Sequence, residues 1–155
     1  TENSITHHIY IPLYVGVLKE IQSSKKNHII LKICNRYHTQ FFYENNVKGD
    51  TTYEKLCSKN KNIDNIIGFS LLISHLEKED IIDNFIEKVL DPFMNYLSSS
   101  SKDEVEIFKM LVSFEKISKI HYQIIPKRYQ DILVQLKENT TNSKIRFKIM
   151  DILNE

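Results

Sequence analysis

The chain has 155 residues, of which 41% are hydrophobic and only three each are Gly and Pro, and its formal net charge is +1. This length suits one domain with one core, and the composition excludes disorder, collagen-like repeats and a turn-dense β-sandwich. The charge is unevenly distributed: residues 1–63 and 107–155 each carry nine Lys or Arg against five Asp or Glu, whereas residues 64–106 carry three against ten. Basic ends and an acidic middle can present different patches to different partners, although ordinary solvated helix faces also produce this pattern.

The sequence contains no apolar run of 18 or more residues, and its first residues lack the basic segment and small-residue cleavage site of a signal peptide. Cys34 and Cys57 are the two cysteines, and no CxxC motif occurs. We therefore expect a protein of a reduced compartment, cytoplasmic or alternatively nuclear, without a membrane span or a disulfide framework.

Apolar residues recur at helical spacing almost throughout, which predicts an all-α fold of about seven helices. The first is expected at residues 6–22, where Pro12 bends the helix or moves its start to Ile11. The second, 27–44, has a clear apolar stripe from Ile30 to Phe41. Residues 45–60 are polar and predict a connection, although Thr51 and Glu54 fit a capping box that could start a short helix.

The third helix is expected at residues 61–76, and its nearly continuous apolar surface predicts a central position. The fourth, 78–97, would begin with Glu79, Asp80 and Asp83 because carboxylates favour helix N-termini, and it contains Pro92 as a possible kink. Four serines at 98–101 then form a linker.

Three further helices are expected in the last third of the chain. The fifth, 102–119, would open with a capping box of Ser101 and Glu104, and the sixth has Pro126 in its first turn and ends near residue 138. The seventh, 143–154, would be capped by Thr141 or Asn142. Short polar turns between the helices favour antiparallel pairs stacked as an α-solenoid, with a closed bundle as the alternative.

The apolar stripes predict which side chains are largely buried. The predicted core positions are Tyr37, Phe41, Ile67, Leu71, Phe85, Val89, Phe108, Val112, Ile132, Leu136, Ile149 and Leu153.

The sequence nominates no catalytic chemistry. GxGxxG, GxxxxGK[ST], GxSxG and HExxH motifs are all absent. Cys34 and His38 are one helical turn apart, but zinc would need four ligands and Cys34 lies on an apolar stripe, so we interpret the pair as a core thiol and a surface histidine. We expect no enzyme activity, cofactor, metal or small-molecule substrate.

Basic residues are the better candidates for function. Arg is rare in this chain, and its planar guanidinium gives oriented contacts with carboxylates or phosphates, so Arg36, Arg128 and Arg146 rank first. Each could instead be a solvated charge, and Arg36 or Arg146 could bond a neighbouring helix C-terminus. The other basic candidates are Lys32, Lys127, Lys144 and Lys148.

Residues 143–153, SKIRFKIMDIL, closely resemble the last helix of the middle domain of translation initiation factor 4G, whose pattern is S-[RK]-I-R-F-x-[LI]-x-D-[VI]-L. Three earlier segments also resemble the family and occur in family order. KICNRYHTQF resembles its L-L-N-R-x-x-x-x-F segment through Asn35, Arg36 and Phe41, NIDNIIGFSLLISHL resembles its N-I-x-F-I-G-x-L helix, and DIIDNFIEKVL resembles the helix after that.

The resemblance covers residues 9–154 and implies a right-handed stack of HEAT-type helix pairs without catalytic residues. Domains of this family usually have about five helix pairs, whereas about seven helices are expected here. Residues 1–155 would therefore form one domain that lacks the first pair. The family serves as a platform for a DEAD-box RNA helicase, initiation factor 4A in translation, and often for RNA. The resemblance therefore implies a scaffold in translation initiation or mRNA metabolism. Taken with the basic candidates, it gives the expected partner-binding residues Asn35, Arg36, Lys127, Arg128, Lys144, Arg146 and Lys148. Direct RNA binding along a basic strip, or an adaptor role in mRNA decay, splicing or cap binding, is the alternative.

Overall fold

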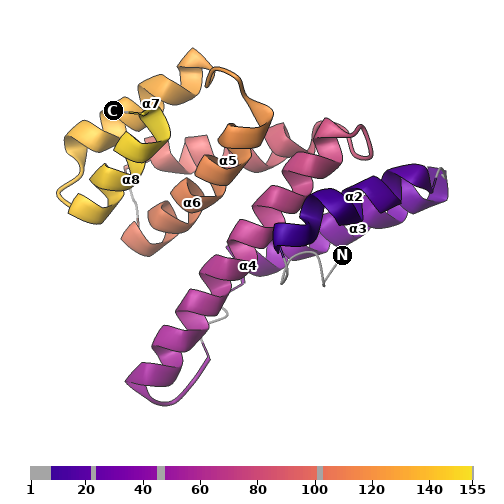
Figure 1. Ribbon diagram of the computed structural model, residues 1–155. Coiled ribbons are helices and arrows are strands. Elements are labelled where there is room, and N and C mark those ends of the chain that lie inside the picture. Colours follow the sequence, from indigo (N-terminus) through magenta and orange to yellow (C-terminus); the bar gives the residue numbers. More distant parts are fainter. Residues whose placement is uncertain (1–7, 22–23, 45–47, 101–102, 155) are drawn as a thin grey trace. The chain divides into compact units, whose positions relative to one another are not determined.

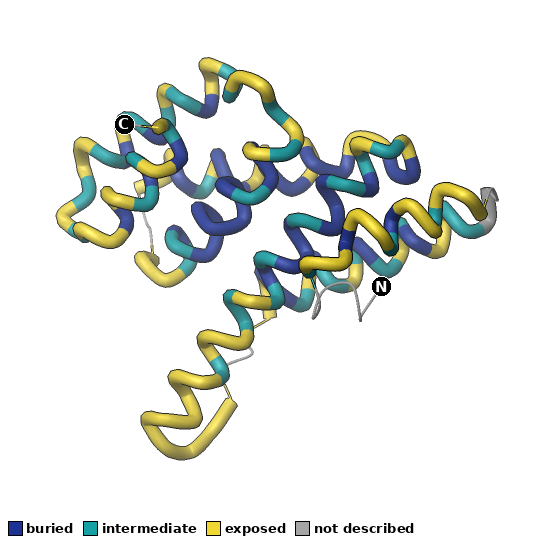
Figure 2. The backbone as a smooth tube through the Cα atoms, in the orientation of Figure 1, coloured by how far each residue is buried: buried dark blue, intermediate teal, exposed yellow. Residues whose placement is uncertain are grey.

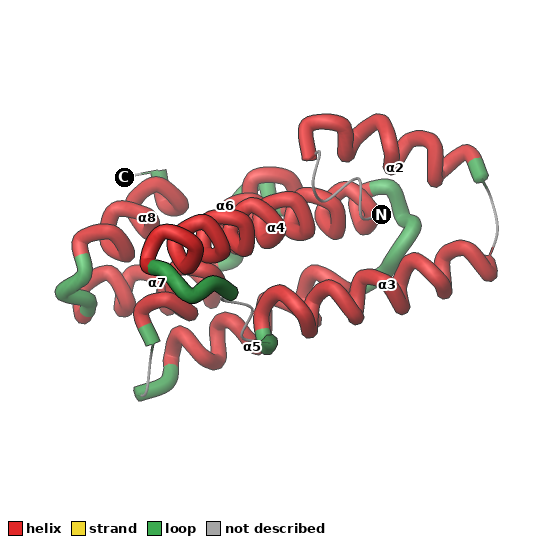
Figure 3. Tube along the Cα trace, turned by 90° about the horizontal axis from the view of Figure 1, so that it is seen from below, coloured by secondary structure: helices red, strands yellow, loops and turns green. Residues whose placement is uncertain are grey.

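A computed structural model describes residues 8–21, 24–44, 48–100 and 103–154. Within these ranges the chain forms seven α-helices and one 3-10 helix and no strand, so the predicted all-α class is confirmed (Figure 1). Loops and turns connect the helices, as Figure 3 shows. The chain divides into two compact units, residues 1–85 and 86–155, and each is described separately below.

The first unit contains the 3-10 helix η1 (His8–Tyr10) and the helices α2 (Ile11–Glu20), α3 (Ser24–Phe42) and α4 (Thr52–Lys78), with α2 and α3 both packed on α4. Helix α2 begins at Ile11, so Pro12 lies in its first turn. Proline has no backbone N–H to donate, and the N–H groups of a first turn have no partner within the helix, so Pro12 costs no hydrogen bond there. Its expected ends at residues 6 and 22 lie outside the described residues.

Helix α4 begins earlier than expected. The connection predicted at 45–60 is wrong from Thr52 onward, because the helix runs unbroken for 27 residues, or about 40 Å. The predicted capping box is confirmed: Thr51 accepts a hydrogen bond from the Glu54 backbone N–H at 3.1 Å, and Glu54 accepts one from the Thr51 N–H at 3.0 Å. Glu54, Lys55, Lys59 and Lys61, which have good helix propensity, follow this cap, and the helix does not stop until Lys78.

The predicted start of the fourth helix at residue 78 is also wrong. Asp80 has a left-handed backbone (φ 57°), and its N–H donates to the Glu77 carbonyl while the Ile81 N–H donates to that of Leu76. These two bonds form a Schellman motif, which closes α4, so Glu79 and Asp80 end one helix rather than open the next. Helix α5 (Phe85–Ser98) begins after this turn and continues through Pro92.

The second unit also contains α6 (Glu104–His121), α7 (Lys127–Asn139) and α8 (Ser143–Leu153), with α8 packed on α6 and α7. Asp103 caps α6 by accepting from the Val105 and Glu106 N–H groups, so the predicted Ser101–Glu104 capping box is wrong, and Ser101 itself lies outside the described residues. Asn142 caps α8, one of the two residues predicted for that place.

The predicted core positions are confirmed in part. None of the twelve is exposed, and half of them are fully buried (Figure 2). The buried ones are Phe41, Phe85, Val89, Val112, Leu136 and Ile149, and the half-buried ones are Tyr37, Ile67, Leu71, Phe108, Ile132 and Leu153.

Candidate partner-binding surface

The predicted partner-binding residues are divided between the two units. Asn35 and Arg36 lie on α3 of the first unit. The other five lie in the second unit, Lys127 and Arg128 in the first turn of α7 and Lys144, Arg146 and Lys148 on α8. We therefore treat them as two separate groups.

Arg36 is exposed on α3 and makes no hydrogen bond or ion pair with any described residue. Its neighbour Asn35 is half-buried and donates from Nδ2 to the Leu31 carbonyl at 2.9 Å, within the same helix. Lys32, one turn before Arg36, is also exposed. The guanidinium of Arg36 thus keeps its hydrogen-bonding groups available for a ligand.

Arg128 is exposed but already bound by its own unit. Its guanidinium lies 3.5 Å from Glu87 and 3.8 Å from Asp91 of α5, and it donates to the Tyr129 hydroxyl at 2.8 Å. That hydroxyl donates to Asp91 at 3.1 Å, and burial together with this bond raises the pKa of Tyr129. The network joins α7 to α5, whereas the neighbouring Lys127 is exposed and makes no hydrogen bond or ion pair with a described residue.

The three basic residues of α8 each have a structural partner. Arg146 donates to the carbonyl of Thr140, the C-cap of α7, at 2.7 Å, which is the helix-end contact considered as its alternative role. The Lys144 ammonium lies 4.0 Å from the centre of the Phe108 ring. Lys148 donates to Glu115 at 2.9 Å.

Glu115 is the centre of a charge cluster that sequence reasoning missed. Its side chain is 9% exposed and accepts hydrogen bonds from Lys119 at 2.6 Å and from Lys148 at 2.9 Å. Burial alone would raise the pKa of this carboxyl, but the two ammonium groups lower it to about 2. The Lys119 partner is an i, i+4 pair that the sequence could have indicated, whereas the Lys148 partner comes from another helix.

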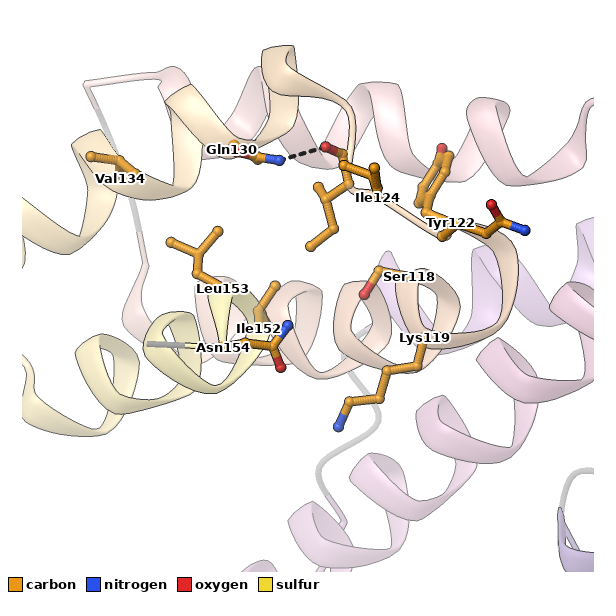
Figure 4. Close-up of a pocket in the computed structure, with 11 residues that line it drawn as sticks. Ser118, Lys119, Tyr122, Ile124, Gln130, Val134, Ile152, Leu153 and Asn154 are labelled. Carbon is orange, nitrogen blue, oxygen red and sulfur yellow. Dashed lines mark hydrogen bonds between the residues drawn. The ribbon is translucent and has the colours of Figure 1, made fainter.

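A pocket of about 360 Å³ lies between the ends of α6 and α8, the 122–126 loop and α7 (Figure 4). Apolar side chains such as Ile124, Val134 and Ile152 line it. Two of its polar side chains donate hydrogen bonds to backbone carbonyls. Gln130 Nε2 donates to the Ile125 carbonyl at 2.6 Å, and Ser118 Oγ donates to the Glu115 carbonyl at 3.1 Å. These contacts hold the loop and the helix end, and they do not form the nucleophile and base pair that covalent catalysis requires.

Cys34 and His38 are both in the core of the first unit. The interpretation of His38 as a surface residue is wrong: it is 8% exposed and lies among the rings of Phe42, Phe69 and Phe85. Cys34 is fully buried, as expected, and burial raises its pKa to about 12. The described part of the chain contains no group of three or more His, Cys, Asp or Glu side chains placed to hold a metal ion.

Protein-family models, curated proteins and solved structures were compared with this chain, and none matches it. Among the described helices, none is both long enough and apolar enough to cross a membrane.

Proposed function

We propose that this chain is a non-enzymatic helical scaffold that binds a DEAD-box RNA helicase of the initiation factor 4A type, in translation initiation or another step of mRNA metabolism. The observation that carries the proposal is Arg36, which is exposed and uncommitted within the segment that resembles the N-R pair of the factor 4G middle domain. An exposed Arg without an intramolecular partner can enter a protein interface, where Arg is enriched among the residues that dominate affinity.

The state of the other basic residues makes Arg36 the first choice for a test. Arg128, Arg146 and Lys148 hold helices of their own unit together, so their substitution would change stability as well as binding. Lys127 is exposed at the start of α7, and we keep it as a secondary candidate.

We further propose that the helices stack as a right-handed HEAT-like solenoid. Helices α7 and α8 contact each other and are separated only by residues 140–142, a connection of the length that joins antiparallel neighbours. Small-angle X-ray scattering tests this arrangement, because a solenoid gives a more elongated particle than a closed bundle of the same mass.

The binding test reverses one charge on α3. We expect Arg36→Glu to weaken binding to the helicase at least about tenfold in calorimetry, because it replaces an attractive contact with a repulsive one. The thermal midpoint should barely move, since the side chain is exposed and makes no contact to lose.

Lys32→Glu is the matched control, because it makes the same change of charge one turn away on the exposed surface of the same helix. We expect it to weaken binding less than about threefold, and Arg36→Lys to recover only part of the affinity because Lys lacks the planar guanidinium. If the wild-type protein binds no such helicase but binds unstructured RNA with a steep salt dependence, direct RNA binding replaces the scaffold proposal.

A further inference from the structure

The first half of α4 carries a mostly apolar stripe that the rest of the chain leaves open. Tyr53, Leu56, Asn60, Ile63 and Ile67, which we call the α4 seam, follow one another at steps of three and four residues and so lie along one side of the helix. Tyr53 is 75% and Leu56 is 54% exposed, Asn60 is exposed, and the two isoleucines are half-buried (Figure 2). The α4 seam is therefore accessible to a further helix.

The alternating steps are the seven-residue repeat of a coiled coil, in which positions a and d form the contact between two helices. The a positions are Tyr53, Asn60 and Ile67, and the d positions are Leu56 and Ile63. The chain itself already covers the next d and a positions, Ser70 and Ser74, which are 0% exposed. The contact is therefore limited to residues 53–67, a length of about 22 Å.

Asn60 indicates which helix fits the α4 seam. A single Asn at an a position specifies the register and the number of strands in a coiled coil. In a parallel pair of identical helices, a faces a, so the two Asn60 amides can hydrogen-bond to each other. In an antiparallel pair, a faces d, and Asn60 would lie against Leu56 with its amide unbonded, which costs free energy. The α4 seam therefore favours a second copy of the same helix in parallel orientation.

The charges beside the α4 seam favour the same arrangement. Lys59 is at position g and Asp64 is at the next e, and in a parallel pair these positions of opposite helices are neighbours. Lys59 of each copy would thus face Asp64 of the other. Both side chains are exposed and neither has an ion pair with a described residue. The remaining e and g residues, Thr52, Cys57 and Ile66, are uncharged, so no like charges oppose each other.

We propose that this chain forms a parallel homodimer through the α4 seam, as a short two-stranded coiled coil centred on Asn60. Helices in such a pair cross at about 20°, so the two copies separate beyond Ile67. The contact is smaller than a standard interface, but α4 is already formed and capped, so pairing does not include the cost of starting a helix. The proposal does not rest on Arg36 or on binding of a helicase.

Sedimentation equilibrium of the full chain tests the dimer. The weight-average mass should rise above the 18.4 kDa of one chain, with a dissociation constant of about 10 μM to 0.5 mM. Leu56→Glu should weaken dimerisation at least about tenfold, because it places like charges opposite each other at a d position. Leu13→Glu is the matched control, because Leu13 is 66% exposed on α2, and it should leave dimerisation unchanged. Both variants should keep the wild-type circular dichroism spectrum.

A charge exchange tests the orientation. Lys59→Glu places a carboxylate beside Asp64 of the second copy and should weaken dimerisation about three- to tenfold. Adding Asp64→Lys should restore the wild-type affinity, because it re-forms the pair in the parallel arrangement. Asn60→Leu should strengthen association at least about fivefold and allow species larger than a dimer, because Asn at position a costs stability and specifies the number of strands.

Three results would overturn the proposal. The first is a chain that stays monomeric at about 1 mM, which would leave the α4 seam to a helix of another protein. The second is a dimer that Leu56→Glu leaves intact, including one that Leu13→Glu dissociates, since the contact would then lie elsewhere. The third is a Lys59→Glu, Asp64→Lys double variant that dimerises no better than Lys59→Glu alone, which would exclude the parallel pairing.

Discussion

The Glu115 cluster makes the stability of the second unit depend on pH in a way that one substitution can isolate. Glu115 is nearly buried and accepts hydrogen bonds from Lys119 and Lys148. Its pKa falls from 4.5 to about 2 in the folded protein, where the favourable contacts with both lysines outweigh the effect of burial. Because one pKa unit corresponds to about 1.4 kcal/mol, the ionised carboxylate contributes up to about 3 kcal/mol to the free energy of unfolding.

The sign follows from the lowered pKa. A carboxyl that ionises more readily when folded stabilises the protein above its unfolded pKa of 4.5 and loses that contribution as the pH falls toward about 2. Glu115→Gln removes the charge at nearly constant size and leaves Lys148, whose side chain is 22% exposed, without its counter-ion. The variant should therefore be about 2–3 kcal/mol less stable near neutral pH, and the difference should nearly vanish at about pH 2.

Urea unfolding followed by far-ultraviolet circular dichroism at a series of pH values measures this difference. Glu138→Gln is the matched control, because Glu138 is an exposed carboxylate on α7 without an ion pair to any described residue, and it should change stability by less than about 0.5 kcal/mol. A loss below about 1 kcal/mol for Glu115→Gln near neutral pH, or a loss that stays constant down to about pH 2, would refute the reasoning.

Two other positions give sharp expectations. Cys34 is fully buried with a raised pKa, so it should resist thiol reagents until the protein unfolds, whereas the exposed Cys57 should react at once. Cys34→Ser should lower the free energy of unfolding by about 1–3 kcal/mol in thermal unfolding. Metal analysis of the purified protein should find no stoichiometric zinc. Asp80 has φ 57° in the turn that ends α4. Asp80→Gly should therefore keep or slightly raise the thermal midpoint, whereas Asp80→Val should destabilise the protein by about 1–2 kcal/mol. Equal midpoints for the two variants would contradict the role of the left-handed backbone.

Local patterns predicted those elements whose signals are carried by adjacent residues. The start of α2 at Ile11, the Thr51–Glu54 capping box and the Asn142 cap each depend on neighbours within one helical turn. The polarity of residues 45–60 predicts a loop, but Lys and Glu after a good cap propagate a helix about as readily as Leu does, so α4 starts at Thr52.

The α4–α5 turn and the site contacts were out of reach for a different reason. Acidic residues suit a helix N-terminus, but at Asp80 the ability to adopt a left-handed backbone decided the outcome, and it ended α4. The partners of Lys148 and of Tyr129 lie 33 and 38 residues away along the chain, so only tertiary packing brings them together. The contacts of Arg128 with Glu87 and Asp91 were out of reach for the same reason. Arg146 differs, because it bonds a carbonyl only six residues before it, which is the helix-end role that the sequence offered as an alternative.

The two ends of α4 differ in how much tertiary packing stabilises them. Residues 66–76 are mostly buried, whereas residues 52–61 are almost entirely exposed and gain little from tertiary packing. The buried part acts as a preformed nucleus, so the exposed turns extend from it without the entropic cost of starting a helix, and the capping box holds their far end. Backbone amides in the exposed turns should then exchange with solvent through local fraying, while those of residues 66–76 exchange only when the core of the unit opens. Although α4 is one continuous helix, the protection of its backbone amides from hydrogen exchange should rise along its length from the exposed turns to the buried ones.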